Sequence, residues 1–184
     1  MSESQAPTTA GLTPAQIQTR EKIENGSRHG VGGPAEAWSH SPTLFNAVNG
    51  LGGFFRTPDN HLNKRLTELA IIITARARTA QIEWYAHVPR ARKSGISREI
   101  VSAIAMRETP VFEHQDEAIV YRFSQELNQD FSVSDETFDQ AVSILGSKAV
   151  VDLTALVGFY NMVAMTLKTY QLQPPTDATR LLPE

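Results

Sequence analysis

The sequence has no cysteine among its 184 residues. This absence excludes disulfide bonds, thiolate zinc sites, iron–sulfur clusters and any cysteine nucleophile or redox dithiol. The chain also has little net charge, because 17 basic residues against 20 acidic residues leave a formal charge of −3. Such a balance gives no basic surface for nucleic acid and no attraction to an anionic membrane. We therefore expect neither of them as a partner.

A targeting signal is also missing, since the first residues have neither the basic region nor the apolar region of a signal peptide. The longest apolar run, Val150–Leu167, is interrupted by Asp152 and Asn161. A run of that length with polar breaks favours a buried core helix over a membrane span. We expect a soluble, cytoplasmic protein.

The chain divides into two parts by composition. Residues 1–35 are rich in Gly, Ser, Thr, Pro and Gln. We interpret this part as a flexible N-terminal arm with one possible short helix at Pro14–Glu24. Residues 36–184 have the length of one domain and form a single helical domain in this interpretation.

The second part has no run that alternates with a period of two, and its apolar residues recur at helical spacing, which predicts an all-α fold. Ser41, Ser97, Ser134 and Ser147 are expected to cap helices, and Gly95 and Gly146 to end them. The predicted helices are Pro42–Phe55, Lys64–Arg78, Ile82–Ser94, Arg98–Arg107, Glu113–Asp130, a helix between Ser134 and Gly146, and Lys148–Tyr170. The helix after Ser134 is expected to bury the stripe Phe138, Ala141, Val142 and Leu145.

One carboxylate stands out in the helix predicted over Lys64–Arg78, which is apolar on both of its sides. A helix of this kind lies inside the core. Glu68 is then surrounded by aliphatic side chains, and a buried carboxylate is costly unless it has a partner. We predict that Glu68 is buried and paired with an arginine or with His87. A structural ion pair and a functional acid–base group both remain open.

The next predicted helix places Glu83 and His87 four residues apart, on one face beside Trp84. A carboxylate one turn from an imidazole fixes its tautomer and raises its basicity. That arrangement suits general acid–base catalysis near neutral pH. The alternative is an ordinary surface pair of the kind that many amphipathic helices carry.

A metal site is an alternative for these residues, because Glu68, Glu83 and His87 can in principle form a carboxylate–histidine site together with His114. The di-iron bundle pattern needs two Glu-x-x-His units, and the sequence has none. We expect no metal and no other cofactor.

The stretch Arg65–Ile104 resembles the core motif of the carboxymuconolactone decarboxylase family. The similar residues are Glu68-Leu69, the following aliphatic helix, Glu83-Trp84, His87, Ala91, Gly95 and Glu99-Ile100. The lead-in with Gly33-Pro34 and Ser41-Pro42 and the tail Leu153–Lys168 with Tyr160 are similar more loosely. The resemblance implies an alkylhydroperoxidase D-like helical bundle that forms homotrimers or homohexamers.

The thiol branch of this superfamily has a Glu, eleven residues, a Cys-x-x-Cys pair, three residues and a His. Aligned from Glu68, this pattern places Ala80 and Glu83 at the two cysteines and His87 at the histidine. Dithiol peroxidase chemistry therefore does not carry over. The sequence is more similar to the cysteine-free branch, whose named activity decarboxylates a γ-carboxylated muconolactone in aromatic catabolism.

The resemblance implies a cofactor-independent lyase, a decarboxylase acting on a small carboxylated lactone or β-keto acid. His87 is the candidate proton donor or electrophile, and Glu83 orients it. Glu68 is a second acid–base group or the structural partner of an arginine.

Three further residues are candidates for substrate binding. Trp84 offers an apolar wall, and Arg76 or Arg90 can hold a substrate carboxylate through the arginine fork. Two alternatives remain: a peroxidase-related homologue that has lost its redox cysteines, and a non-catalytic oligomeric binding protein with this fold.

Overall fold

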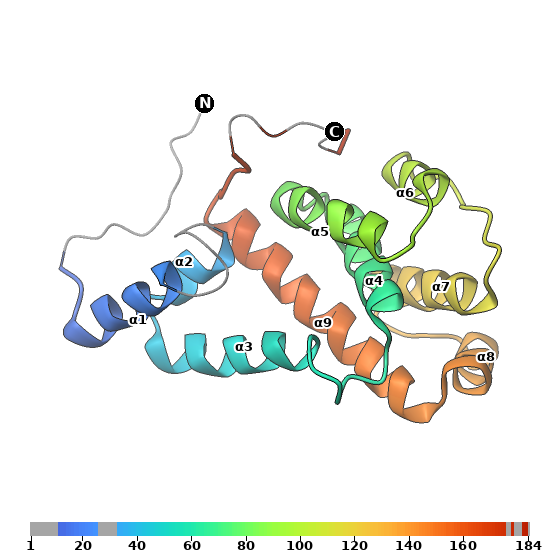
Figure 1. The fold of residues 1–184 in the computed structure, drawn as a ribbon, viewed down its shortest axis with the longest axis horizontal. Helices are drawn as coiled ribbons and strands as arrows, with labels where there is room; N and C mark the ends of the chain where they lie inside the picture. The colour runs from blue at the N-terminus through green and yellow to red at the C-terminus, as the bar shows by residue number, and fades with distance from the viewer. Residues whose placement is uncertain (1–10, 26–32, 176–177, 179–181, 184) are drawn as a thin grey trace.

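The computed structural model describes residues 11–25, 33–175, 178 and 182–183. Over these residues the chain forms helices and no strand, which confirms the all-α prediction (Figure 1). The helices are α1 (Pro14–Glu24), α2 (Pro34–Trp38), α3 (Pro42–Phe54), α4 (Lys64–Ala77), α5 (Gln81–Lys93), α6 (Arg98–Ala105), α7 (Gln115–Asp130), α8 (Asp135–Leu145) and α9 (Ser147–Thr169).

The bundle is organised around α4, which packs against α5, α7 and α9. Figure 1 shows α9 running along most of the molecule. The first part of α9 lies beside α8, and α2 lies near its C-terminal end. Helix α4 is thus covered on several sides, and all of its residues from Leu66 to Arg76 are buried. This confirms the prediction that the helix lies inside the core. It also means that the polar side chains of α4 need partners.

Three of the four expected serines occupy N-cap positions, and two of these make a side-chain capping bond. The hydroxyls of Ser97 and Ser134 accept hydrogen bonds from the first turns of α6 and α8. Ser41 is the N-cap residue of α3 before Pro42, as predicted, but makes no side-chain capping bond, and the prediction for Ser147 is wrong. Ser41 has a ψ of 83°, far from the extended backbone of the other two, so its hydroxyl makes no capping bond. Ser147 is the first helical residue of α9, and Gly146 takes the cap position.

Two other details differ from the sequence analysis. Helix α2 was not predicted, because five residues beside a glycine-rich stretch give too short a pattern to recognise. In α8, Phe138 is 48% exposed instead of buried, while Thr137 and Ala141 face the core. The rest of the predicted stripe holds, because Ala141 is buried and Val142 and Leu145 pack against the core. Thr137 takes the place of Phe138, and its hydroxyl donates to a carboxylate oxygen of Glu126 at 2.6 Å.

The expected short helix in the N-terminal segment is present as α1. It begins with a capping box between Thr13 and Gln16, and Ile23 is buried against the core. The rest of that segment, residues 1–10 and 26–32, lies outside the described residues. The division of the chain at residue 35 stays a prediction.

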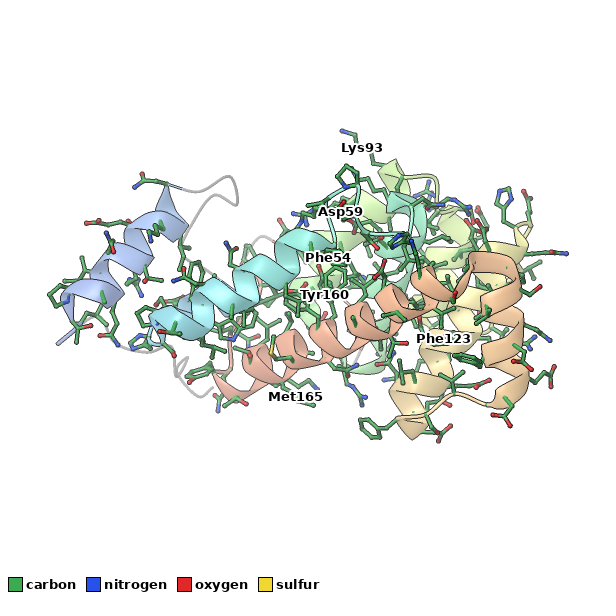
Figure 2. All side chains as sticks on the ribbon, turned by 90° about the horizontal axis from the view of Figure 1, so that it is seen from below. Phe54, Asp59, Lys93, Phe123, Tyr160 and Met165 are labelled. Carbon is green, nitrogen blue, oxygen red and sulfur yellow. The ribbon has the colours of Figure 1, made fainter. Side chains whose placement is uncertain are left out.

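Helix α9 is, among the described helices, the one long and apolar enough to cross a membrane by length and composition. In this fold it is a core helix, since residues such as Leu153 and Leu156 are fully buried. Val151 and Met165 are exposed on its outer side, and Figure 2 shows Met165 at the surface and Phe123 inside. The cytoplasmic location and the homo-oligomer stay predictions.

Candidate functional site

Helices α4 and α5 pack side by side and bring together the three residues for which sequence analysis predicted catalysis. The Nδ1 atom of His87 lies 2.7 Å from a carboxylate oxygen of Glu68. Its Nε2 atom lies 3.2 Å from a carboxylate oxygen of Glu83, one turn earlier on α5. One imidazole therefore bridges two carboxylates. The predicted burial and pairing of Glu68 are confirmed, and its partner is His87 instead of an arginine.

A fourth side chain completes this group, which we call the His87 cluster: Glu68, Glu83, His87 and Tyr160. The hydroxyl of Tyr160 lies 3.4 Å from Nε2 of His87, and the two rings meet edge to face at 5.2 Å. Tyr160 belongs to α9, and Figure 2 labels it in the middle of the molecule. Sequence analysis noted Tyr160 only as part of a loosely similar tail. Only the packing of α9 places it in the site.

The protonation of the cluster follows from its geometry. Both ring nitrogens of His87 face acceptor oxygens, so both are satisfied when both carry hydrogen, as in an imidazolium. Burial lowers the pKa of His87, but its hydrogen bonds to Glu68 and Glu83 outweigh burial, and the pKa is raised above its ordinary value. Burial, together with the negative charges of Glu83 and Glu68, raises the pKa of Tyr160. Tyr160 therefore keeps its proton and remains a hydrogen-bond donor.

Two of the residues predicted to bind substrate lie near the cluster. Trp84 is buried, 3% exposed, on the same helix as His87. Arg90 is exposed, and its charge acts against the rise in the pKa of Tyr160, as does the charge of Arg56. Both guanidiniums thus lie close enough to affect the cluster electrostatically. Arg56, at the end of α3, was not predicted, because no local pattern links it to His87.

Arg76 lies elsewhere, contrary to the sequence expectation of one shared site. It follows Glu68 by eight residues on α4, which is about 12 Å along the helix axis. Its Nε donates to the backbone oxygen of Ala105 at the end of α6, at 2.8 Å. Helical spacing identified Arg76 as part of α4 but did not indicate which end of the helix borders the site.

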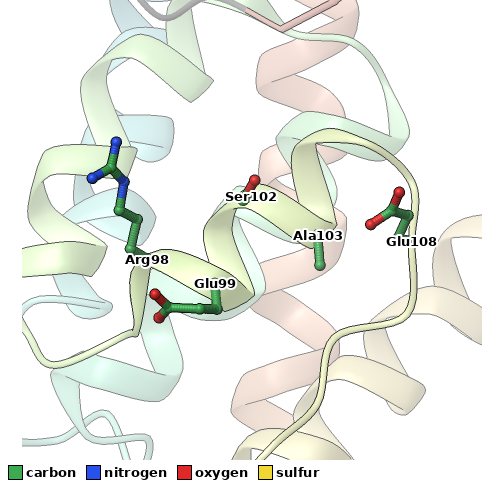
Figure 3. A pocket seen from close by; sticks show the side chains of 5 residues that line it. All are labelled: Arg98, Glu99, Ser102, Ala103 and Glu108. Atoms are coloured by element: carbon green, nitrogen blue, oxygen red, sulfur yellow. The ribbon is translucent and has the colours of Figure 1, made fainter.

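The His87 cluster is largely closed to solvent. The side chain of His87 is 5% exposed, and those of Glu68 and Glu83 are 10% and 9% exposed. Two hollows are described in the structure, one on the outer side of α6 (Figure 3) and one at the C-terminal end of α4. Neither is lined by a residue of the cluster. Within the described residues, no set of three His, Asp or Glu side chains is arranged to hold a metal ion. The metal-independent chemistry stays a prediction.

Comparison with known proteins places the fold. No protein-family model matches the chain, and no curated protein matches it. A Silicibacter protein described as an uncharacterized peroxidase-related protein has a TM-score of 0.76 at 13% identity, covering 99% of this chain and 97% of its own. A Ralstonia eutropha protein, described as an alkylhydroperoxidase AhpD core and uncharacterized peroxidase-related protein, has a TM-score of 0.74 at 16% identity, covering 94% and 91%.

A third solved structure is an Agrobacterium tumefaciens protein of unknown function, described as a putative antioxidant defence protein AhpD. Its TM-score is 0.63 at 20% identity, covering 77% of this chain and 97% of its own. These similarities show that the chain has an AhpD-like helical fold, as the sequence resemblance implied. Identities this low show the fold and not an activity.

Proposed function

We propose that this protein is a cofactor-independent acid–base enzyme that decarboxylates a small carboxylated lactone or β-keto acid, with His87 as the proton donor. The observation that carries the proposal is a single buried imidazole held between the carboxylates of Glu68 and Glu83 at 2.7 and 3.2 Å. Perturbed groups of this kind gather at functional sites more often than elsewhere.

The reaction needs two things from the protein. When the bond to the carboxylate breaks, carbon dioxide leaves and the electron pair passes to an enolate, which must be stabilised and then protonated on carbon. The imidazolium of His87 supplies the proton, and the proton is then replaced from water. The hydroxyl of Tyr160, protonated at ordinary pH, can donate a hydrogen bond to the enolate oxygen.

The distances favour Nε2 as the reactive nitrogen. The Nδ1 contact with Glu68 is short, 2.7 Å, and fixes the orientation of the ring. Nε2 has two longer contacts, 3.2 Å to Glu83 and 3.4 Å to Tyr160, which a substrate atom can replace at lower cost. In this proposal Glu68 is the orienting carboxylate and Glu83 exchanges protons, the reverse of the simplest expectation from sequence. Arg90 and Arg56 attract the anionic substrate.

The absence of cysteine decides between this proposal and peroxidase chemistry. The proteins of similar fold are described as peroxidase-related, and that description belongs to them. The thiol pattern of the superfamily aligns a cysteine with Glu83. A carboxylate beside the histidine can exchange protons but cannot attack a peroxide as a thiolate does.

A non-catalytic role for the cluster is the second candidate. It is favoured by the burial of all four side chains and by the position of both described hollows away from them. In this case the cluster is an ion-paired structural element linking α4, α5 and α9.

The test is to assay carbon dioxide release from carboxylated lactones and β-keto acids with the wild type, His87→Ala and Glu83→Gln. We expect His87→Ala to lower the rate roughly 10²–10⁴-fold, the usual contribution of general acid–base catalysis. The matched control is His61→Ala, which removes a different histidine–carboxylate pair, with Asp152 at 2.8 Å. Unchanged turnover in His87→Ala, or turnover equally reduced in His61→Ala, contradicts the proposal. Melting temperatures recorded alongside separate lost chemistry from lost folding.

A further inference from the structure

A second charged group surrounds a cavity of about 410 Å³ at the C-terminal end of α4. Its lining comes from the ends of α4 and α6 and from the second half of α7. Three of the lining residues, Arg76, Arg78 and Arg107, are arginines, and none is acidic. Among the described residues, no carboxylate lies within ion-pair distance of these three.

The arginines are held by neutral groups. Arg76 is only 7% exposed; its Nη1 donates to the hydroxyl oxygen of Thr79 at 3.3 Å, and its Nε donates to Ala105. Nη2 of Arg107 donates to the same Thr79 oxygen at 3.4 Å. One hydroxyl therefore joins two guanidiniums and neutralises neither. These bonds occupy two of the five N–H donors of Arg76.

The partial negative charges at the helix ends around the cavity offset only part of the arginine charge. The backbone carbonyls at a helix C-terminus together amount to about half a negative charge. Three such ends, of α4, α6 and α7, offset about half of the three arginine charges. Burial lowers the pKa of Arg76, and so does the charge of Arg107. The cavity is thus positive and contains no anion of its own among its lining residues.

The helix ends beside the cavity share one backbone feature. Thr79, Arg107 and Phe131, the residues that follow α4, α6 and α7, have positive φ angles of 48°, 60° and 56°. Glycine is the usual residue there, and a β-branched residue such as threonine is rare at positive φ. The side chain of Thr79 is the one that accepts from both Arg76 and Arg107. Both turns end their helices in the usual way, since the amides of Ala80 and Glu108 donate to the backbone oxygens of Ala75 and Ala103.

We propose that this cavity binds a small organic anion, whose carboxylate or phosphate group lies between Arg76 and Arg107. The arginine fork suits both groups. The apolar part of the ligand lies against Ile73, Ala77 and Ile104, which complete one wall. The volume is within the range of small-molecule sites. The site is separate from the His87 cluster and does not depend on the proposed reaction.

Two further side chains add to the site, Tyr121 of α7 and Arg78 at the end of α4. The hydroxyl of Tyr121 accepts a hydrogen bond from the side chain of Gln125 at 3.2 Å, so its own hydrogen is free to point at an anion. Arg78 is held by the backbone oxygen of Asn128 at 2.8 Å and by the side chain of Asn161, and it contributes charge from a fixed position.

The other hollow, on α6, lacks these features. Figure 3 shows Arg98, Glu99 and Glu108 along it. All three are exposed, and the two carboxylates oppose the single cation. This difference makes Arg98 a suitable control position, because it is an arginine on α6 outside the proposed site.

The experiment is isothermal titration calorimetry of the full chain with phthalate and, separately, with inorganic phosphate. We expect saturable binding of one anion per chain. Arg107→Gln should weaken it ten- to about a hundredfold, the worth of a charge-assisted hydrogen bond, and Arg98→Gln should leave it unchanged. Tighter binding of phthalate identifies a carboxylate ligand and tighter binding of phosphate a phosphorylated one, and both outcomes support the proposal.

A second variant keeps the test independent of folding. Thr79→Gly removes the shared hydroxyl but suits the positive φ, so the variant should fold like the wild type and bind about tenfold more weakly. Two results overturn the proposal: no saturable binding of either anion up to about 10 mM, or an Arg98→Gln variant that loses as much affinity as Arg107→Gln.

Discussion

Helix α4 carries a charged cluster in its first half and another at its last turn, and the two differ in sign, pairing and access. In the first, Glu68 shares the cation of His87 with Glu83, and both ring nitrogens have partners. In the second, Arg76 and Arg107 share one neutral oxygen and border a cavity. The paired cluster is closed, whereas the unpaired cluster is open.

The two clusters compensate the desolvation of buried charges in different ways. Removing a charged group from water is unfavourable at either end of the helix. The His87 cluster compensates within the chain, with opposite charges at hydrogen-bond distance. The arginine cluster has no such compensation among the described residues, so a ligand from solution is the natural source of negative charge. The four predictions below test this contrast, from the largest effect to the smallest.

The largest change is expected from Glu68→Gln. Glu83 still neutralises the imidazolium of His87, but the amide cannot form the charge-assisted hydrogen bond to Nδ1. We expect a loss of about 1.5–3 kcal/mol of unfolding free energy, the usual contribution of such a bond. Urea unfolding at pH 7 measures it. The control is Glu136→Gln, whose contact with Arg122 at 3.7 Å is exposed and should matter little. A Glu68→Gln variant as stable as this control contradicts the paired-cluster account.

The second prediction concerns pH. Because the pKa of His87 is raised in the folded protein, its stabilising contribution is fully present below the unfolded value of about 6.5. The contribution is lost as the pH rises through the raised value, and each unit of the rise is worth about 1.4 kcal/mol. Unfolding free energies of the wild type and His87→Gln, measured between about pH 6 and 9, should therefore converge with increasing pH. Divergence with increasing pH contradicts the raised pKa.

Much of the fold and of the His87 cluster could be predicted from the sequence, because local rules determine most of the helices. Caps, glycine stops and helical spacing placed α4 to α9 within a few residues of their bounds. The buried carboxylate of Glu68 followed from its aliphatic neighbours, and the Glu83–His87 pair from a four-residue spacing.

The remaining features depend on tertiary packing that no local pattern contains. Tyr160 reaches His87 from 73 residues away, through the packing of α9 on the bundle. The guanidinium of Arg76 was expected near His87 and instead lies at the other end of α4, because helical spacing gives a face but not the neighbours along it. Phe138 is exposed where burial was expected for a similar reason, because Thr137, hydrogen-bonded to Glu126, takes the inward position.

The third prediction is that Arg76→Gln costs less unfolding free energy than Glu68→Gln, about 1 kcal/mol. The variant loses a charge-assisted bond to Ala105 but also removes a buried cation that Arg107 repels. The same urea experiment gives the comparison. Added phthalate should stabilise the wild type by mass action and not the variant. A loss as large as that of Glu68→Gln means that Arg76 is already neutralised within the chain.

The smallest effect, and the opposite sign, is expected from Ser124→Ala on α7. Ser124 is fully buried, and its hydroxyl has no hydrogen-bond partner among the described residues. Its backbone oxygen accepts from the side chain of Asn128, whose own backbone oxygen holds Arg78. The substitution removes an unsatisfied polar atom and keeps those backbone contacts.

Two gains contribute to this result. Removing an unpaired buried hydroxyl is favourable, and alanine forms helix better than serine, so stability should rise by about 0.5–1 kcal/mol. Ser143→Ala, at an exposed position in α8, gains only the helix preference. The difference between the two variants in urea unfolding therefore isolates the buried hydroxyl. A Ser124→Ala variant less stable than Ser143→Ala means that the buried hydroxyl has a hydrogen-bond partner. The polar groups that hold Arg78 are then as fully paired as those of the His87 cluster.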